Sequence, residues 1–215
     1  MRFPTTPMCD GALLAAFEPT TRDTDVFVAT AAKAGQTWLL ALLHHLRTRG
    51  RDPGFSGLGA LGVTPWLELP WDPDSAAPYD REARLAGFAA LPDPRVFKMH
   101  VPYDEIPRPP GSSAKVMTIT RDPRDLPWSM YCHMLAMREE VRGPFVADFD
   151  AFFEGWLERG YVFRVVRSFW AHRDDPGVLW LRYEDLQEDL PREARRCVAF
   201  LGWDLTEADV ARACA

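Results

Sequence analysis

The chain has 215 residues, of which 47% are hydrophobic and 26% are charged, a balance typical of a globular protein built as one domain. Its net charge of −6 argues against a general nucleic-acid binder, because such a protein carries a basic field. The four cysteines show neither CxxC nor Cys/His ligand spacing, which disfavours a zinc site and a disulfide framework.

Short apolar runs alternate with helical patterns along the chain. Strands are predicted at residues 26–29, 96–99, 116–120 and 178–182, which are apolar on both faces, as buried parallel strands are. Helices are predicted at 37–49, ended by Gly50, from Asp122 as N-cap and Pro123 onward, at 161–173, and at 191–201, ended by Gly202. This alternation predicts an α/β fold, a central parallel sheet flanked by helices, in a single domain spanning residues 1–215.

Residues 51–94 differ in character from the rest of the chain. They carry many of its prolines and glycines, together with the aromatic residues Phe55, Trp66, Trp71, Tyr79 and Phe88. Long loops in compact domains often form lids or binding walls. We therefore predict a Pro/Gly/aromatic-rich insertion on the substrate side; the alternative is a surface crossover held by a few aromatic anchors.

One sequence in this segment, GLGALG at residues 57–62, matches the dinucleotide fingerprint GxGxxG. That fingerprint has meaning only between a strand and a helix. Here it follows RDPG and runs into TP, so neither neighbour fits. We do not expect NAD to bind at this sequence.

The loop AAKAGQTW at residues 31–38 lies between a predicted strand and a predicted helix. Successive backbone N–H groups at a helix N-terminus form an anion cradle, to which Lys33 adds a positive charge and Thr37 a hydroxyl. The loop is not a Walker A motif, because Lys33 precedes Gly35 instead of following the second glycine. The alternative interpretation is a simple strand-to-helix turn with a solvated lysine.

Four segments, in the order in which the family carries them, resemble motifs of the cytosolic sulfotransferases. They are KAGQTW at residues 33–38, similar to the family's PKSGTTW; FKMHVP at 97–102, similar to KTHLP; Arg121 and Ser129, spaced like its 3′-phosphate signature; and LRYEDL at 181–186, similar to its YED segment. PWLE at 65–68 also resembles the stretch that borders the family's acceptor pocket. The resemblance covers roughly residues 25–203 and implies the P-loop-like, nucleotide-binding sulfotransferase fold.

The resemblance implies an enzyme that moves a sulfuryl group from 3′-phosphoadenosine 5′-phosphosulfate (PAPS) to a hydroxyl or amine, releasing PAP and using no metal. It implies that His100 is the general base, and that Lys33, at the 5′-phosphate, and Lys98 are the other catalytic residues. The nucleotide-binding residues it implies are Lys33, Ala34, Gly35, Gln36, Thr37 and Trp38 in the loop, Arg121 and Ser129 at the 3′-phosphate, and Tyr183 at the adenine.

The chemistry of the reaction gives physical reasons for these residue types. Sulfuryl transfer moves negative charge onto the leaving phosphate, so fixed cations and N–H dipoles lower the barrier. An imidazole with a pKa near 6.5 suits proton removal near pH 7. His100 ends a predicted strand beside Lys98, and open parallel sheets bind their ligands at such ends. The remaining histidines are interpreted as structural: His44, His45, His133 and His172.

Two of the implied nucleotide contacts have competing structural interpretations. Arg121 offers planar, bidentate recognition of a phosphate, yet it also stands where it could simply pair with Asp122 or Asp125 at a helix start. Tyr183, taken alone, is more typical of a core residue at a strand end than of a ligand contact.

The chain departs from the family's pattern at several positions. Ala34 and Gln36 stand in place of the usual Ser and first Thr of the loop, and we expect backbone N–H groups and the Gln36 amide to donate to the phosphate instead. Pro127, on the helix with Ser129, fits only a first turn. The family's Arg-Lys-Gly segment, which closes over the 3′-phosphate, does not occur before Ala215, so we expect a domain without it.

Two classes of function fit these observations. The first is an active sulfotransferase, whose 3′-phosphate site Arg22, Arg124 or a partner chain would complete. The second is a non-catalytic or degenerate PAP- or PAPS-binding relative. A P-loop-like small-molecule kinase is disfavoured because GK[ST] is missing. The joint presence of Lys33, Lys98 and His100 favours the enzyme, since a binding protein needs no general base.

The expected acceptor is a small hydrophobic molecule. Its candidate contacts are Phe55, Trp66 and Trp71, with Phe153 or Trp156 as further aromatic walls, although core packing explains some of them equally well. No run approaches the ~18 apolar residues of a membrane span, and residues 11–17 lack the basic start of a signal peptide. We expect a cytoplasmic protein with no nucleic-acid or membrane partner; a homo-oligomer is left open.

Overall fold

The computed structural model describes residues 3–52, 55, 62–71, 78–145 and 147–215. Its centre is one parallel sheet in the order β2-β1-β3-β4, built from β1 (Val26–Ala29), β2 (Val96–Met99), β3 (Lys115–Thr120) and β4 (Val178–Arg182). The predicted strands are confirmed, and β3 starts one residue earlier than expected. The GLGALG sequence lies outside the described residues except for Gly62.

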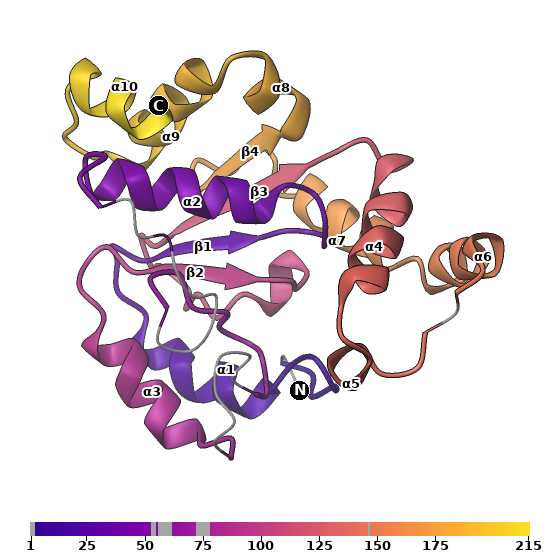
Figure 1. Ribbon diagram of the computed structural model, residues 1–215. Coiled ribbons are helices and arrows are strands. Elements are labelled where there is room, and N and C mark those ends of the chain that lie inside the picture. The colour runs from indigo at the N-terminus through magenta and orange to yellow at the C-terminus, as the bar shows by residue number, and fades with distance from the viewer. Residues whose placement is uncertain (1–2, 53–54, 56–61, 72–77, 146) are drawn as a thin grey trace.

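Helices cover both faces of the sheet, which confirms the predicted α/β class (Figure 1). On one face Val26 and Val28 pack with α2, α8, α9 and α10. On the other, Phe27 and Ala29 pack with α1, α3 and α7. The helices are α1 (Gly11–Phe17), α2 (Gln36–Arg47), α3 (Arg81–Ala90), α4 (Asp125–Ala136), α5 (Glu139–Arg142), α6 (Phe149–Arg159), α7 (Tyr161–Trp170), α8 (Tyr183–Glu188), α9 (Leu190–Leu201) and α10 (Glu207–Cys214).

Several predicted helix boundaries need correction. Helix α4 does not begin at Asp122 and Pro123: these residues form a turn in which the Asp125 N–H donates to the Asp122 carbonyl at 3.0 Å, and the helix starts at Asp125. Helix α7 ends at Trp170, before the predicted end at residue 173. Helix α2 ends at Arg47, because Arg49 and Gly50 both take positive φ, at 57° and 65°. The end of α9 at Gly202 is as predicted.

Residues 51–94 contain a helix that the sequence analysis did not predict. Helix α3 begins after Asp80, whose carboxylate accepts the Ala83 N–H at 3.0 Å. From α3 the buried Arg84 donates to the backbone carbonyls of Leu69 and Trp66, at 2.7 and 2.6 Å. The guanidinium therefore fixes the path of residues 66–71, which run beside the end of β2.

A buried ion pair joins the starts of β1 and β2. Asp25 and Arg95 are 0% and 1% exposed, and the guanidinium binds the carboxylate through Nε and Nη2, at 2.7 and 2.5 Å. Two further N–H groups, on Nη1 and Nη2, donate to the carbonyls of Phe88 and Thr20. Phe17, on α1, lies 5.2 Å from the guanidinium carbon. Every charge in the pair is thus satisfied inside the core.

Candidate active site

Three of the predicted catalytic and nucleotide-binding residues follow the carboxyl ends of neighbouring strands. The loop with Lys33 follows β1, His100 follows β2, and Arg121 follows β3. These strands are neighbours and parallel, so their carboxyl ends meet at one edge of the sheet (Figure 1). This is where open parallel sheets bind ligands.

The loop after β1 has a backbone that only certain residues adopt. Lys33 has φ 70° and Gly35 has φ 103°. A Cβ at Gly35 would lie 2.5 Å from Cδ2 of Tyr183, so a larger residue would displace that ring. Glycine is therefore required at this position both for its backbone conformation and for space.

Tyr183 connects this loop to the residues that follow β3. Its ring lies edge-to-face with Trp38 at 5.6 Å, and the Arg121 guanidinium carbon stands 4.6 Å from its centroid. Arg121 also forms an ion pair with Asp125 at 3.1 Å, which is the pairing at a helix start that its structural interpretation predicts. Ser129 lies one turn into α4, half-buried.

Two cations lie close together at this edge. Burial lowers the pKa of Lys33, and the nearby Arg121 guanidinium lowers it further. Like charges repel, so such a pair is stabilised when an anion lies between or beside them. Together with the backbone N–H groups at the start of α2, these two cations fit an anionic nucleotide phosphate.

Gln36 does not point toward this cradle as expected. Its amide nitrogen donates to the backbone carbonyls of Val28 and Met99, at 2.8 and 2.7 Å. The expectation that the side chain donates to a phosphate is therefore wrong, because the amide pairs the carbonyls at the ends of β1 and β2 instead. The Gln36 backbone N–H lies at the start of α2, where it can donate a hydrogen bond to an anion.

His100 is held in one orientation by three other segments. Its Nδ1 lies 2.8 Å from the Thr30 carbonyl, its backbone N–H donates to Glu68 Oε1 at 2.6 Å, and its carbonyl accepts from the Tyr161 hydroxyl. A carbonyl only accepts, so Nδ1 carries the proton and Nε2 presents a lone pair. Burial, then the Lys98 charge, lowers the pKa of His100 to about 3, so the ring is neutral near pH 7.

Lys98 and Trp66 form a stacked pair beside His100. The Lys98 Nζ lies 3.5 Å from the centroid of the Trp66 ring, which packs edge-to-face on His100 at 5.1 Å. Burial lowers the pKa of Lys98 to about 8, while the charge of Glu68 raises it. The ammonium is therefore charged at neutral pH, poorly solvated, and held by an aromatic face.

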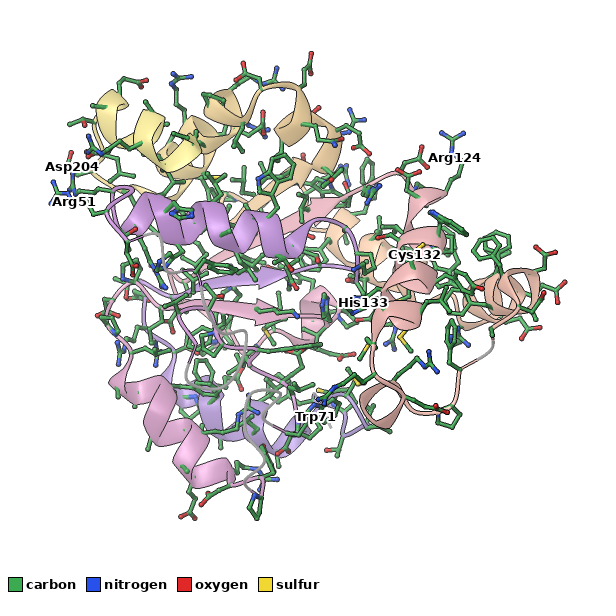
Figure 2. The ribbon with its side chains drawn as sticks, in the orientation of Figure 1. Arg51, Trp71, Arg124, Cys132, His133 and Asp204 are labelled. Carbon is green, nitrogen blue, oxygen red and sulfur yellow. The ribbon has the colours of Figure 1, made fainter. Side chains whose placement is uncertain are left out.

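The sequence analysis missed a further group at this site, His133. It was interpreted as structural, but it is exposed on α4, and burial together with the charges of Lys33 and Lys98 lowers its pKa. Figure 2 shows it on the side of α4 toward the sheet. Its proximity to the two lysines arises through the fold, so no local pattern could have indicated it.

The three candidate acceptor contacts have different surroundings. Trp66 reaches His100, as just described, but Phe55 packs on His44 at 6.1 Å, in the last turn of α2. Trp71 is 40% exposed (Figure 2), and its carbonyl accepts from Arg84. The further candidates, Phe153 and Trp156, stack on each other at 6.2 Å along α6.

Two broader properties concern the described part of the chain. Residues 3–52, 55, 62–71, 78–145 and 147–215 contain no group of three or more His, Cys, Asp or Glu side chains that could hold a metal ion. In the same residues, the helices are too short or too polar to cross a bilayer.

The chain matches known proteins over most of its length. The model of the sulfotransferase domain family matches residues 23–215. Sulfotransferase 4A1 of Mus musculus is 31% identical over 207 residues, which are 95% of this chain and 69% of that protein. The amine sulfotransferase of Oryctolagus cuniculus is 27% identical over 191 residues, covering 88% of this chain and 60% of that protein.

Solved structures show the same architecture. Retinol dehydratase in complex with retinol and PAP is 27% identical, with a TM-score of 0.66 over 90% of this chain and 64% of that chain. Mouse sulfotransferase SULT7A1 in complex with PAP has a TM-score of 0.74 at 23% identity, over 96% of this chain and 68% of that chain, a likeness of fold. With the family model spanning residues 23–215, the chain belongs to the sulfotransferase family.

Proposed function

We propose that the chain transfers a sulfuryl group from PAPS to a hydroxyl or amine of a small acceptor. The convergence of Lys33, Lys98 and Arg121 at one edge of the sheet carries this proposal, in a chain whose net charge is −6. His100 lies beside these cations as a neutral imidazole, and its Nε2 has no hydrogen-bond partner among the described residues.

Different residues would bind the 5′-phosphate, the 3′-phosphate and the adenine of PAPS. Lys33 and the N–H groups at the start of α2 would hold the 5′-phosphate, with the Thr37 hydroxyl. Arg121 and Ser129 would hold the 3′-phosphate, while Trp38 and Tyr183 offer aromatic faces for the adenine. PAPS supplies an activated sulfuryl group with a phosphate leaving group.

His100 would remove the acceptor proton, and Lys98 would stabilise the sulfuryl group as it is transferred. The acceptor oxygen forms a bond to sulfur as the bond from sulfur to the phosphate oxygen breaks, and the acceptor proton goes to Nε2 of His100. The Thr30 carbonyl holds the Nδ1 proton, which keeps the basic nitrogen on the reacting side. The Lys98 ammonium stabilises the sulfuryl oxygens, and Lys33 stabilises the leaving phosphate.

A hydrophobic alcohol or phenol is the acceptor class that we propose. Retinol dehydratase has been solved with retinol and with androsterone, both together with PAP. In this chain the Trp66 ring beside His100 supplies an apolar wall at the position where the acceptor proton must be removed. The cytoplasmic location stays a prediction.

Titration calorimetry with PAP and transfer of labelled sulfate from PAPS test this proposal. We expect PAP to bind, and phenols or hydrophobic alcohols in an acceptor panel to become sulfated. Absence of PAP binding would refute the assignment of the nucleotide site. Binding without transfer to any phenol, alcohol or amine would instead favour a non-catalytic relative.

Replacing Arg121 with alanine is expected to weaken PAP binding by roughly 10- to 100-fold, since a hydrogen bond to a charged group contributes about 1.5–3 kcal/mol. Arg173→Ala is the matched control, because Arg173 is exposed and also pairs with an aspartate, Asp174, at 3.3 Å. Calorimetry on both variants measures the difference. Equal losses would mean that Arg121 supports the helix start and does not bind phosphate.

Replacing Gly35 with alanine is expected to weaken PAP binding by at least ~10-fold, because positive φ costs an L-residue about 1–2 kcal/mol and the new Cβ displaces Tyr183. Gly111→Ala is the control, since it has a similar φ of 82° but open space around it. Both variants should lose thermal stability through the cost of positive φ, Gly35→Ala more because its Cβ also meets Tyr183, whereas only Gly35→Ala should lose affinity. Unchanged PAP affinity in Gly35→Ala would contradict the placement of the nucleotide against this loop.

A further inference from the structure

Glu68 is a buried carboxyl group at the centre of the site. It is 2% exposed, and its Oε1 accepts two hydrogen bonds of 2.6 Å, from the His100 backbone N–H and from Trp66 Nε1. Its Oε2 is buried without a hydrogen-bond partner among the described residues. A carboxyl in such a place is destabilising unless a charge or a function compensates it.

The backbone explains why Glu68 reaches this position. The Lys98 N–H donates to the Pro65 carbonyl at 2.9 Å, and the Leu67 N–H donates to the Lys98 carbonyl at 3.0 Å. Residues 65–67 therefore extend the sheet beside β2, where Trp66 pairs with Lys98. Glu68 follows directly, level with His100 on the neighbouring strand.

The compensating charge is Lys98. The Lys98 side chain is 7% exposed and stands on the Trp66 ring, whose Nε1 is bound by Glu68. Burial has the largest effect on both groups, bringing the pKa of Glu68 up to about 7 and that of Lys98 down to about 8. The hydrogen bonds from Trp66 and the His100 N–H, and then the Lys98 charge, act in the opposite direction and lower the pKa of Glu68. The Glu68 charge in turn raises the pKa of Lys98.

We propose that Glu68 is a positioning residue for sulfuryl transfer, whose carboxylate fixes the His100 peptide and keeps Lys98 charged at the reacting centre. This inference rests on the proposed function. Other titratable groups coupled to Glu68 or Lys98 are Cys9, Lys33, His100, His133 and Tyr161.

Glu68→Gln separates the two parts of this role. The amide oxygen can still accept from the His100 and Trp66 N–H groups, so the hydrogen bonds are retained. The negative charge is lost, and Lys98 then deprotonates at lower pH. The activity lost in the variant should therefore grow as the pH rises from about 6 to about 9, whereas a purely structural defect would be independent of pH.

The chain is well suited to a direct measurement, because it contains three lysines, Lys33, Lys98 and Lys115. Lysine-selective isotope labelling gives three side-chain signals, and Lys98→Arg assigns one of them. In Glu68→Gln we expect the titration midpoint of Lys98 to fall by about one pH unit or more. Glu105→Gln is the control: Glu105 is half-buried on the turn after the same strand and should leave the midpoint unchanged.

The kinetic part uses the same variants with PAPS and an unsulfated acceptor that the wild-type protein is found to sulfate. We expect kcat/KM of Glu68→Gln to fall by roughly 10-fold at pH 8 and by less at pH 6, with PAP affinity within about two-fold of wild type. Glu68→Asp retains the charge and should retain the Lys98 midpoint, which gives a second test where the amide variant folds poorly. An unchanged midpoint with a pH-independent loss of activity would overturn the proposal.

The failure of this inference can be told apart from that of the proposed function. If the wild-type protein transfers no sulfuryl group, the proposed function is wrong, and so is the proposed role of Glu68 in catalysis. The Lys98 titration needs no substrate, so a shifted midpoint would still support the coupling of Glu68 to Lys98, and an unshifted one would reject it.

Discussion

Replacing His100 with alanine is expected to lower kcat for sulfuryl transfer by about 10²- to 10⁴-fold, with PAP affinity within about two-fold of wild type. The reason is geometric: the Thr30 carbonyl fixes the Nδ1 proton, so Nε2 is the nitrogen that can take the acceptor proton. Lys33 and Arg121, which we place at the phosphates, do not depend on the imidazole.

The depressed pKa of His100 adds a test that needs no acceptor. Burial, followed by the Lys98 and Lys33 charges, lowers the pKa of the imidazole to about 3. An anionic nucleotide offsets those charges, so the pKa should rise when PAP binds. Nitrogen NMR of the ring, titrated with and without PAP, measures this shift and reports which nitrogen carries the proton.

The matched control is His172→Ala. His172 stacks on Tyr103 at 3.7 Å, beyond the end of α7, and has no part in the proposed chemistry. It should retain wild-type kcat. Comparable activity in His100→Ala would exclude His100 as the base and direct attention to His133, the imidazole near the same two lysines.

Replacing Asp25 with alanine is expected to destabilise the fold by about 3–5 kcal/mol, because it leaves the Arg95 guanidinium charged and buried without its partner. The loss should appear as a lower midpoint of urea unfolding with an unchanged slope. Asp93→Ala is the control: Asp93 pairs with Arg22 at 2.9 Å, but at the surface, where a pair contributes about 0–1 kcal/mol.

A double variant distinguishes the buried charge from simple loss of packing. Asp25→Leu combined with Arg95→Met removes both charges at once and should recover much of the stability lost by Asp25→Ala. A single variant as stable as wild type would mean that water reaches Arg95. Equal losses in the single and double variants would mean that packing, and not the unpaired charge, dominates.

Strands β1 and β2 were predictable because they are buried at every position. The run Val26–Ala29 is apolar throughout, and the run Val96–Met99 is interrupted by Lys98 alone. The same argument placed Lys33, His100 and Arg121 after strand ends, and parallel pairing then brought them to one edge. Their catalytic and binding roles stay predictions.

The remaining features depend on contacts between distant segments. Helix α3 escaped prediction because it lies in a stretch dominated by Pro, Gly and aromatic residues, although Asp80 caps it locally. Glu68 could be noticed within PWLE, but its hydrogen bond to His100 spans 32 residues. Phe55 looked like an acceptor contact by composition, yet the fold places it near His44.

The side-chain amide of Gln36 connects the helix after the phosphate loop to the end of β2. One nitrogen, on the first residue of α2, holds the carbonyl of Met99, whose peptide continues into His100. The helix that follows the phosphate loop is therefore joined by this amide to the strand end that precedes His100. Together with the hydrogen bond from the His100 ring to the Thr30 carbonyl, this amide couples the position of the phosphate loop to the orientation of the imidazole.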